Sequence, residues 1–116
     1  MPAQKSKVVE HPWGQVDLLI SKGNYKFNEV VLGSGHRTPY QMHEYRHEVW
    51  MIVDGSGLAT FDGLPTDLHR GRMVMIPPGT KHRIENIGEE ELKFLEVQIG
   101  DKCSDEDIIT IEDDYE

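Results

Sequence analysis

Cysteine is almost absent from the sequence, since Cys103 is the single one among 116 residues. One cysteine excludes an intrachain disulfide and makes a reducing, cytosolic setting the default expectation. Long apolar runs are missing too. None approaches the roughly 18 consecutive residues of a membrane span, and residues 1–10 lack the apolar stretch of a secretory signal. We therefore expect a cytoplasmic protein with no membrane partner.

Positive charge is also scarce, with 12 lysines and arginines against 21 acidic residues and a formal net charge of −9. Residues 101–116 hold eight acidic residues and one lysine, so most of the excess lies there. This distribution argues against a nucleic-acid partner, which requires a basic surface. We expect a solvated acidic arm, although Ile108, Ile109 and Ile111 would let it dock as a short strand or helical turn.

Long helical periodicity and internal repeats are missing as well. What the sequence contains is short β-rich runs separated by turns rich in glycine, proline, asparagine and aspartate. The runs predicted to be strands are 16–20, 25–32, 48–53, 58–61, 73–76, 81–86 and 91–99. Turns about every ten residues are typical of an antiparallel sandwich or jelly roll. The length suits one all-β domain over residues 1–116.

In two of these runs the pattern of apolar and polar residues predicts which sides of the strand are buried. Val49–Val53 is apolar on both faces, so we expect it to be buried on both. In the run 91–99, Phe94, Glu96 and Gln98 share one face because side chains alternate along a strand. These polar side chains either face solvent or line a cavity inside a barrel, and the alternation alone does not decide between the two.

Two groups of residues stand at specific spacings along the chain. The first, G-x5-Q-x-H-x4-E-x6-G, covers residues 35–55, and the second, G-x5-P-x-G-x2-H-x3-N, covers residues 71–86. Both resemble the two signature motifs of the cupin superfamily, although most cupins have a histidine in place of Gln41. The resemblance implies the cupin double-stranded β-helix, a small jelly-roll barrel.

The resemblance to cupins also implies one divalent metal ion inside the barrel. Its implied ligands are Gln41, His43, Glu48 and His82. Two imidazoles, a carboxylate and an amide oxygen form a nitrogen and oxygen donor set that suits Zn, Mn, Fe, Co or Ni. A lone buried histidine is more often a hydrogen-bonded core residue, but this spacing favours ligation. The histidines outside the motifs are expected at the surface or in loops, and they are His11, His36, His47 and His69.

A closer resemblance covers residues 11–115. It rests on HPWG (11–14), YKF (25–27), QMHEYRHEVW (41–50), IPPGTKHRIEN (76–86), LEVQIG (95–100) and DEDIITIEDDY (105–115). Together these segments resemble the cupin domain of type II mannose-6-phosphate isomerases, which many relatives carry behind a mannose-1-phosphate guanylyltransferase. The resemblance implies a cupin core over about 11–100, followed by the arm 101–116. It further implies a metal-dependent enzyme that interconverts mannose 6-phosphate and fructose 6-phosphate.

Such an isomerase needs a base within hydrogen-bond reach of the reacting carbon, besides a metal that stabilises negative charge. The candidates for the base are Glu48, Tyr45, His47 and Glu96. A sugar phosphate also needs a cationic group. The candidates for binding it are Arg46, Lys26, Lys81 and Arg83.

Several positions differ from the family pattern. The family usually has histidines where this chain has Glu44, Tyr45 and Val49, and a lysine where it has Asn28. The alternatives are therefore an unphosphorylated sugar or another small polyhydroxy or carboxylate substrate. A dioxygenase, a lyase or a non-catalytic sugar-binding cupin stays open as well, because one fold hosts many chemistries. By analogy with single-domain cupins, we expect a homodimer.

Overall fold

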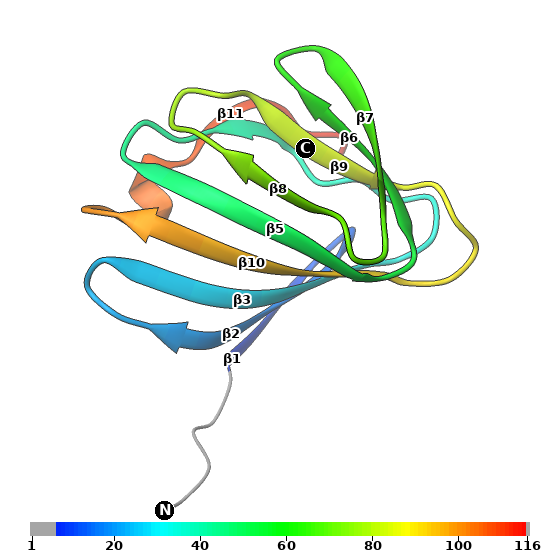
Figure 1. The fold of residues 1–116 in the computed structure, drawn as a ribbon, viewed down its shortest axis with the longest axis horizontal. Coiled ribbons are helices and arrows are strands. Elements are labelled where there is room, and N and C mark those ends of the chain that lie inside the picture. The colour runs from blue at the N-terminus through cyan, green and yellow to red at the C-terminus, as the bar shows by residue number, and fades with distance from the viewer. Residues whose placement is uncertain (1–6, 116) are drawn as a thin grey trace, which may run out of the picture.

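A computed structural model describes residues 7–115. The elements are β1 (Lys7–His11), β2 (Gly14–Ser21), β3 (Tyr25–Leu32), β4 (Tyr40–Met42), β5 (Arg46–Asp54), β6 (Ser56–Phe61), β7 (Leu64–His69), β8 (Met73–Ile76), β9 (His82–Asn86), β10 (Leu92–Gly100), the 3-10 turn η1 (Asp105–Asp107) and β11 (Ile109–Glu112). They form two antiparallel sheets that face each other (Figure 1). The larger has the order β1-β2-β3-β10-β5-β8 and the smaller β11-β4-β9-β6-β7. The predicted all-β architecture is confirmed.

The seven predicted runs correspond to β2, β3, β5, β6, β8, β9 and β10. Of the four remaining strands, β11 lies in the arm segment that was expected to dock as a short strand or helical turn, whereas β1, β4 and β7 lack a clear apolar signal. β4 has only three residues, while β1, β7 and β11 lie at sheet edges. β7 also carries Pro65, which is compatible with an edge strand because one side of that strand needs no ladder hydrogen bond.

An apolar core fills the space between the sheets at one end. Its central side chains come from β5, β10, β3 and β9, and they include Trp50, Ile52, Phe94, Leu32 and Ile84. Each large apolar side chain that is fully removed from water stabilises the fold by roughly 1.5–3 kcal/mol. This core anchors the strands whose other ends carry polar side chains.

The expectation that Val49–Val53 is buried on both faces is wrong for the outer face of the sheet. Trp50 and Ile52 point into the core, whereas Met51 is 38% exposed. β5 is an interior strand of its sheet, but no second layer from residues 7–115 covers the outer side. On the neighbouring β8, Met73 and Met75 are 60% and 68% exposed.

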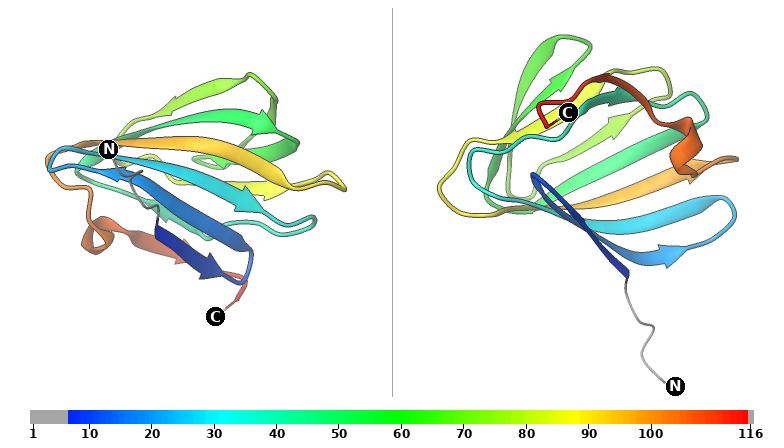
Figure 2. Two further views of the ribbon diagram at one scale, coloured as in Figure 1. Left: turned by 90° about the horizontal axis from the view of Figure 1, so that it is seen from below. Right: turned by 180° about the vertical axis from the view of Figure 1, so that it is seen from behind.

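The acidic arm folds back onto the molecule. After β10 the chain makes η1 and then runs as β11 beside β4, with Ile109 opposite Met42 (Figure 2). The arm therefore docks as a strand, in which Ile109 and Ile111 stay exposed, while Ile108 precedes the strand and lines the cavity. Among residues 7–115, no helix is long and apolar enough to cross a membrane.

Candidate metal centre

His43, Glu48 and His82 meet inside the sandwich. His43 follows β4, Glu48 lies in β5 and His82 begins β9, so three separate strands bring them together. All three are buried, and one potential ligand atom from each lies within 4.8 Å of the others. His43 Nε2 is 2.8 Å from Glu48 Oε2, and His82 Nε2 is 3.9 Å from Glu48 Oε1.

Backbone carbonyls hold both imidazole rings in one orientation. His43 Nδ1 lies 3.3 Å from the Asp107 carbonyl oxygen, and His82 Nδ1 lies 2.9 Å from the Thr80 carbonyl oxygen. A carbonyl oxygen only accepts, so the Nδ1 of each ring is the donor in these contacts and the Nε2 of each ring is the atom turned toward Glu48. Two imidazole nitrogens and one carboxylate thus converge on one point, beside the guanidinium of Arg46. The donor set therefore fits a divalent cation.

Glu48 has two further partners. Trp50 Nε1 donates a 3.1 Å hydrogen bond to its Oε1, and Arg46 Nε donates one of 3.1 Å to its Oε2. Burial would raise the pKa of the Glu48 carboxyl, but His43, His82 and Arg46 outweigh it and lower the pKa to about 2. Burial lowers the pKa of His82 despite the nearby Glu48 carboxylate. An ionised carboxylate and a neutral imidazole are the forms that bind metals.

Arg46 is held tightly beside this group. Its side chain is 4% exposed, and Nη2 lies 3.2 Å from His43 Nε2 while Nη1 donates to the Ser104 carbonyl oxygen. Gly100 stands opposite Arg46 in the β5–β10 ladder. A Cβ at Gly100 would lie 2.9 Å from the Cα of Arg46, so only glycine lets the two strand ends approach this closely.

A cavity of about 560 Å³ adjoins these side chains. Gln41, which stands opposite His82 in the β4–β9 pairing, also lines it. The strand register places six lining residues in two rows across β5, β10 and β3, namely Glu48, Gln98 and Lys26, then Trp50, Glu96 and Asn28. The polar face of β10 therefore lines the cavity, which the alternation in the sequence left undecided.

Glu96 is clamped by two amides in this wall. Asn28 Nδ2 and Gln98 Nε2 both donate to Glu96 Oε1, over 2.9 and 2.8 Å. No hydrogen bond from residues 7–115 reaches Oε2, which is thus left for the cavity. Burial and the charge of Glu48 raise the pKa of the Glu96 carboxyl to about 8, against the effect of the two amides.

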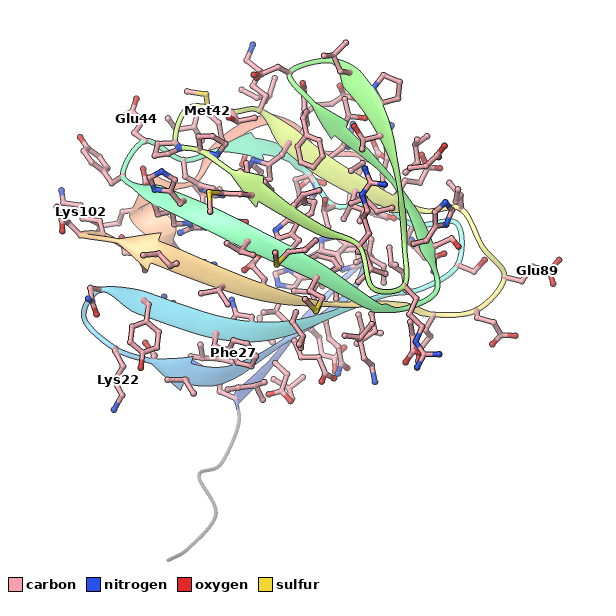
Figure 3. The ribbon with its side chains drawn as sticks, viewed as in Figure 1. Lys22, Phe27, Met42, Glu44, Glu89 and Lys102 are labelled. Atoms are coloured by element: carbon pink, nitrogen blue, oxygen red, sulfur yellow. The ribbon has the colours of Figure 1, made fainter. Side chains whose placement is uncertain are left out.

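The other predicted site residues divide into two groups. Lys26 lines the cavity together with Arg46. Tyr45, His47 and Lys81 are exposed and do not line it, and Tyr45 lies under the Lys102 ammonium, 4.8 Å from its ring. The side chain of Glu44 also points away from the interior (Figure 3). The structure does not bring these residues to the metal centre.

Arg83 is buried outside the cavity lining. Its Nε donates to the Thr38 carbonyl oxygen, and its Nη1 lies 3.5 Å from Glu112 in the acidic arm. The guanidinium also lies over the Tyr40 ring, 5.7 Å from its centroid. The charge of Arg83 is therefore directed to the arm.

The motifs did not predict two contributors. His11 is exposed, as expected, but it also stacks on Trp13 with centroids 4.6 Å apart, and both residues line the cavity. The HPWG segment was the available signal, because its turn pairs β1 with β2 and so brings His11 and Trp13 to the cavity. Asp107 is 5% exposed and contacts His43, and no spacing in the acidic arm distinguished it from its neighbours.

The fold and this site together define a cupin. A double-stranded β-helix protein from Klebsiella pneumoniae superimposes with a TM-score of 0.79 at 16% identity, over 90% of each chain. The Schizosaccharomyces pombe Cnp3 cupin domain gives a TM-score of 0.72 at 17% identity, over 75% of this chain and 64% of that one. At such identities these likenesses show the fold alone.

The sequence comparisons identify the family. Residues 2–113 match the family model described as Mannose-6-phosphate isomerase C-terminal, and the chain belongs to this family. The Klebsiella pneumoniae protein named mannose-1-phosphate guanylyltransferase is 32% identical over 112 residues, which are 97% of this chain and 24% of that protein. The chain spans about a quarter of the length of the curated relatives it matches. The resemblance predicted from the motifs is confirmed.

Proposed function

We propose that the protein is a metal-dependent aldose–ketose isomerase that acts on a sugar phosphate, similar to mannose-6-phosphate isomerase. One observation carries the proposal: the His43–Glu48–His82 group and the clamped carboxyl of Glu96 face the same cavity. A cation site beside an acid–base group is what a proton transfer next to a carbonyl requires. Membership of the family supports the same activity.

In this proposal Gln41 completes the ligand set of one divalent ion, which is Zn, Mn, Fe, Co or Ni. When bound, the ion supplies positive charge that stabilises the negative charge developing on the sugar oxygens. Thr80 and Asp107 keep the Nε2 atoms of His82 and His43 aimed at it. Trp50 and Arg46 hold the Glu48 carboxylate in place.

Glu96 is proposed as the group that carries the proton. Its carboxylate takes the proton from C2 of the aldose and returns it to C1, while the hydroxyl proton passes from O2 to O1. This transfer leaves a ketone at C2 and consumes no other reactant. Glu96 and Glu48 are diagonal neighbours across β10 and β5, a relation that typically separates Cα atoms by about 7–8 Å. That spacing leaves room for substrate between the base and the ligand group.

Lys26 is proposed to bind the phosphate. Arg46 already donates to Glu48 and Ser104, so its role is to position Glu48. No ion pair within residues 7–115 engages Lys26, which lines the cavity in the same row as Glu48. An ammonium group without a protein partner is suited to an anionic substrate group.

The test is a coupled assay of metal-loaded protein on mannose 6-phosphate, with free mannose and lyxose as parallel substrates. We expect turnover of mannose 6-phosphate that stops when a chelator removes the ion and resumes when the ion returns. Absence of turnover on all three sugars would contradict an isomerase. Saturable binding of a sugar under the same conditions would then favour a non-catalytic sugar-binding cupin.

A second candidate is an isomerase for an unphosphorylated polyhydroxy substrate. Asp105 and Asp113 line the cavity, whereas Lys81 and Arg83 do not. These two carboxylates disfavour a doubly charged phosphate near them. A larger kcat/KM for a free sugar than for its phosphate, measured in the same assay, would favour this candidate.

We also propose a homodimer that pairs through the outer face of the larger sheet. The ladders place five apolar side chains side by side on that face, and this outer-face patch consists of Val49, Met51, Met73, Met75 and Val97. Exposed apolar patches mark interaction sites, and a two-fold axis lets one patch cover its own copy. No strongly charged residue interrupts the five.

A further inference from the structure

We infer that the acidic arm is a component of the metal centre, with Asp107 as the residue that positions His43 for metal binding. The inference rests on the proposed metal site. It assigns a role to a segment whose composition predicts a solvated tail.

Asp107 contacts three consecutive residues through three oxygen atoms. Its Oδ1 accepts the Glu44 backbone N–H over 2.9 Å, and its Oδ2 accepts the Tyr45 N–H over 3.0 Å. Its carbonyl oxygen lies 3.3 Å from His43 Nδ1. With a side chain that is 5% exposed, Asp107 makes these contacts where water cannot easily replace it.

These bonds determine the direction of the His43 ring. The carboxylate holds the turn after His43, because both of its oxygens are occupied by backbone donors of that turn. The carbonyl holds Nδ1–H and leaves Nε2 to face Glu48. Such outer partners fix the tautomer and the ring orientation of metal-binding histidines, and they increase the basicity of the ligating nitrogen.

The arm reaches the other proposed ligands as well. The Ser104 carbonyl oxygen accepts from Arg46 Nη1, and Arg46 in turn donates to Glu48. In the β11–β4 ladder, Thr110 stands opposite Gln41. One segment therefore contacts the surroundings of three of the four proposed ligands, each through a different type of contact.

Ionic contacts hold the end of the arm. Arg37 pairs with Asp114 and Glu112 through its Nε and Nη2 atoms, and Arg83 lies 3.5 Å from Glu112. Arg83 is turned away from the cavity because it alternates along β9 with His82 and Ile84, which face inward, and this places it where the arm can pair with it. The acidic residues of the arm thus neutralise specific arginines of the five-stranded sheet and its flanking loop.

The alternative is that the arm only attracts cations through its negative charge. Glu106 separates the two explanations, because it lies next to Asp107 in η1 but is exposed. Removing either charge changes the net charge equally. Only the Asp107 substitution removes the bonds to the His43 turn.

The experiment is calorimetric titration of Co²⁺ into chelator-stripped full-length protein, comparing the natural sequence with Asp107→Ala, Asp107→Asn and Glu106→Gln. We expect Asp107→Ala to weaken Co²⁺ binding by about 10- to 100-fold, the range typical of outer partners of metal ligands. The Co²⁺ affinity of Asp107→Asn should lie between those of Asp107→Ala and the natural protein, because its amide oxygen accepts one backbone N–H while its NH₂ group faces the other. Glu106→Gln should match the natural protein. The visible absorption of bound Co²⁺ should change in Asp107→Ala, since it reports ligand geometry.

Each outcome decides a specific point. If both Asp107→Ala and Glu106→Gln bind Co²⁺ with the affinity and the absorption spectrum of the natural protein, the inference is overturned while the proposed metal site stands. Equal weakening in both variants would favour the simple charge effect and would overturn it too. Failure of the natural protein to bind Co²⁺, Zn²⁺ or Mn²⁺ would overturn both proposals. If thermal melting shows that Asp107→Ala does not fold, Asp107→Asn carries the comparison because it retains one of the two bonds.

Discussion

Trp50 contacts two of the three clustered potential ligands at once. Its Nε1 donates to Glu48 Oε1 over 3.1 Å, and its indole ring packs edge-on against His82 with centroids 5.6 Å apart. A paramagnetic ion bound between these side chains would lie close to the indole. Trp50 is therefore a fluorescent reporter for the proposed metal site.

The first prediction uses this reporter. The chain has two tryptophans, so Trp13→Phe leaves Trp50 as the only one. Titration of this variant with Co²⁺ or Ni²⁺ is expected to quench its fluorescence saturably. Adding His82→Ala should abolish the quenching, whereas His69→Ala, outside the cavity lining, should retain it. Full quenching in the His82→Ala protein would refute the assignment of the site.

The second prediction concerns the proton carrier. Glu96→Gln keeps the shape and removes the ionisable group, and a general base typically contributes about 10²- to 10⁴-fold to the rate. We expect kcat for the isomerisation to fall within this range while the bound metal per chain is unchanged. The control is Glu29→Gln, a carboxylate that pairs with Lys93 and does not line the cavity. A Glu96→Gln enzyme with undiminished kcat would exclude Glu96 as the base.

The third prediction follows from the pKa of Glu96, which rises from an ordinary 4.5 to about 8 in the fold. Between these values the folded state holds a proton that the unfolded state has lost, so stability falls as pH rises. Burial lowers the pKa of His82, so this residue titrates on the acid side of its ordinary 6.5. The change in stability between pH 6.5 and 8 is therefore assigned to Glu96.

Across that interval the metal-free natural protein should lose on the order of 1–2 kcal/mol relative to Glu96→Gln. Urea unfolding of both proteins at matched pH values measures the difference. Parallel pH profiles for the two proteins would show that Glu96 ionises normally in the fold.

The fourth prediction distinguishes Lys26 from Lys81, which the sequence offered as equal candidates for binding the phosphate of the substrate. Lys26 lines the cavity and Lys81 is exposed outside it. Lys26→Gln is expected to raise KM for the sugar phosphate by about tenfold, the effect of losing roughly 1.4 kcal/mol of binding. Lys81→Gln should leave KM unchanged. An effect on KM in Lys81→Gln alone would place the phosphate elsewhere.

The fifth prediction tests the dimer. Met75 in the outer-face patch is 68% exposed, and Leu64, at the start of β7, is 70% exposed. Met75→Glu should shift the sedimentation coefficient of a dimer to that of a monomer, because it places a charge in the proposed interface. Leu64→Glu, matched in exposure, should not. A natural protein that sediments as a monomer at all concentrations would reject the pairing.

Much of the fold follows from local pattern. Turn residues at regular intervals delimited the runs that became β2, β3, β5, β6, β8, β9 and β10. β1, β4 and β7 were missed because pairing with a neighbour, not their own apolar pattern, makes them strands. The edge strand β8 was predicted because its run of four residues is apolar. β4 is an example, since its three residues are held between β9 and β11.

The site divides in a similar way. The resemblance of the two motifs to those of cupins predicted that His43, Glu48 and His82 belong together, and the fold brings them together. The same reasoning kept Tyr45, Lys81 and other neighbouring residues as candidates. Residues adjacent along a strand or loop point in different directions, so proximity in sequence did not separate the cavity lining from the surface.

By itself the sequence predicted an all-β sandwich or jelly roll, because alternation and turns are local properties of a chain. Its resemblance to cupins predicted that His43, Glu48 and His82 belong to one group. Tertiary structure alone decided that the polar face of β10 lines a cavity, that Asn28 clamps Glu96, and that Asp107 holds His43. Each of these contacts joins residues more than 60 positions apart. Strand register and the return of the arm create them, and neither is encoded in a short stretch of sequence.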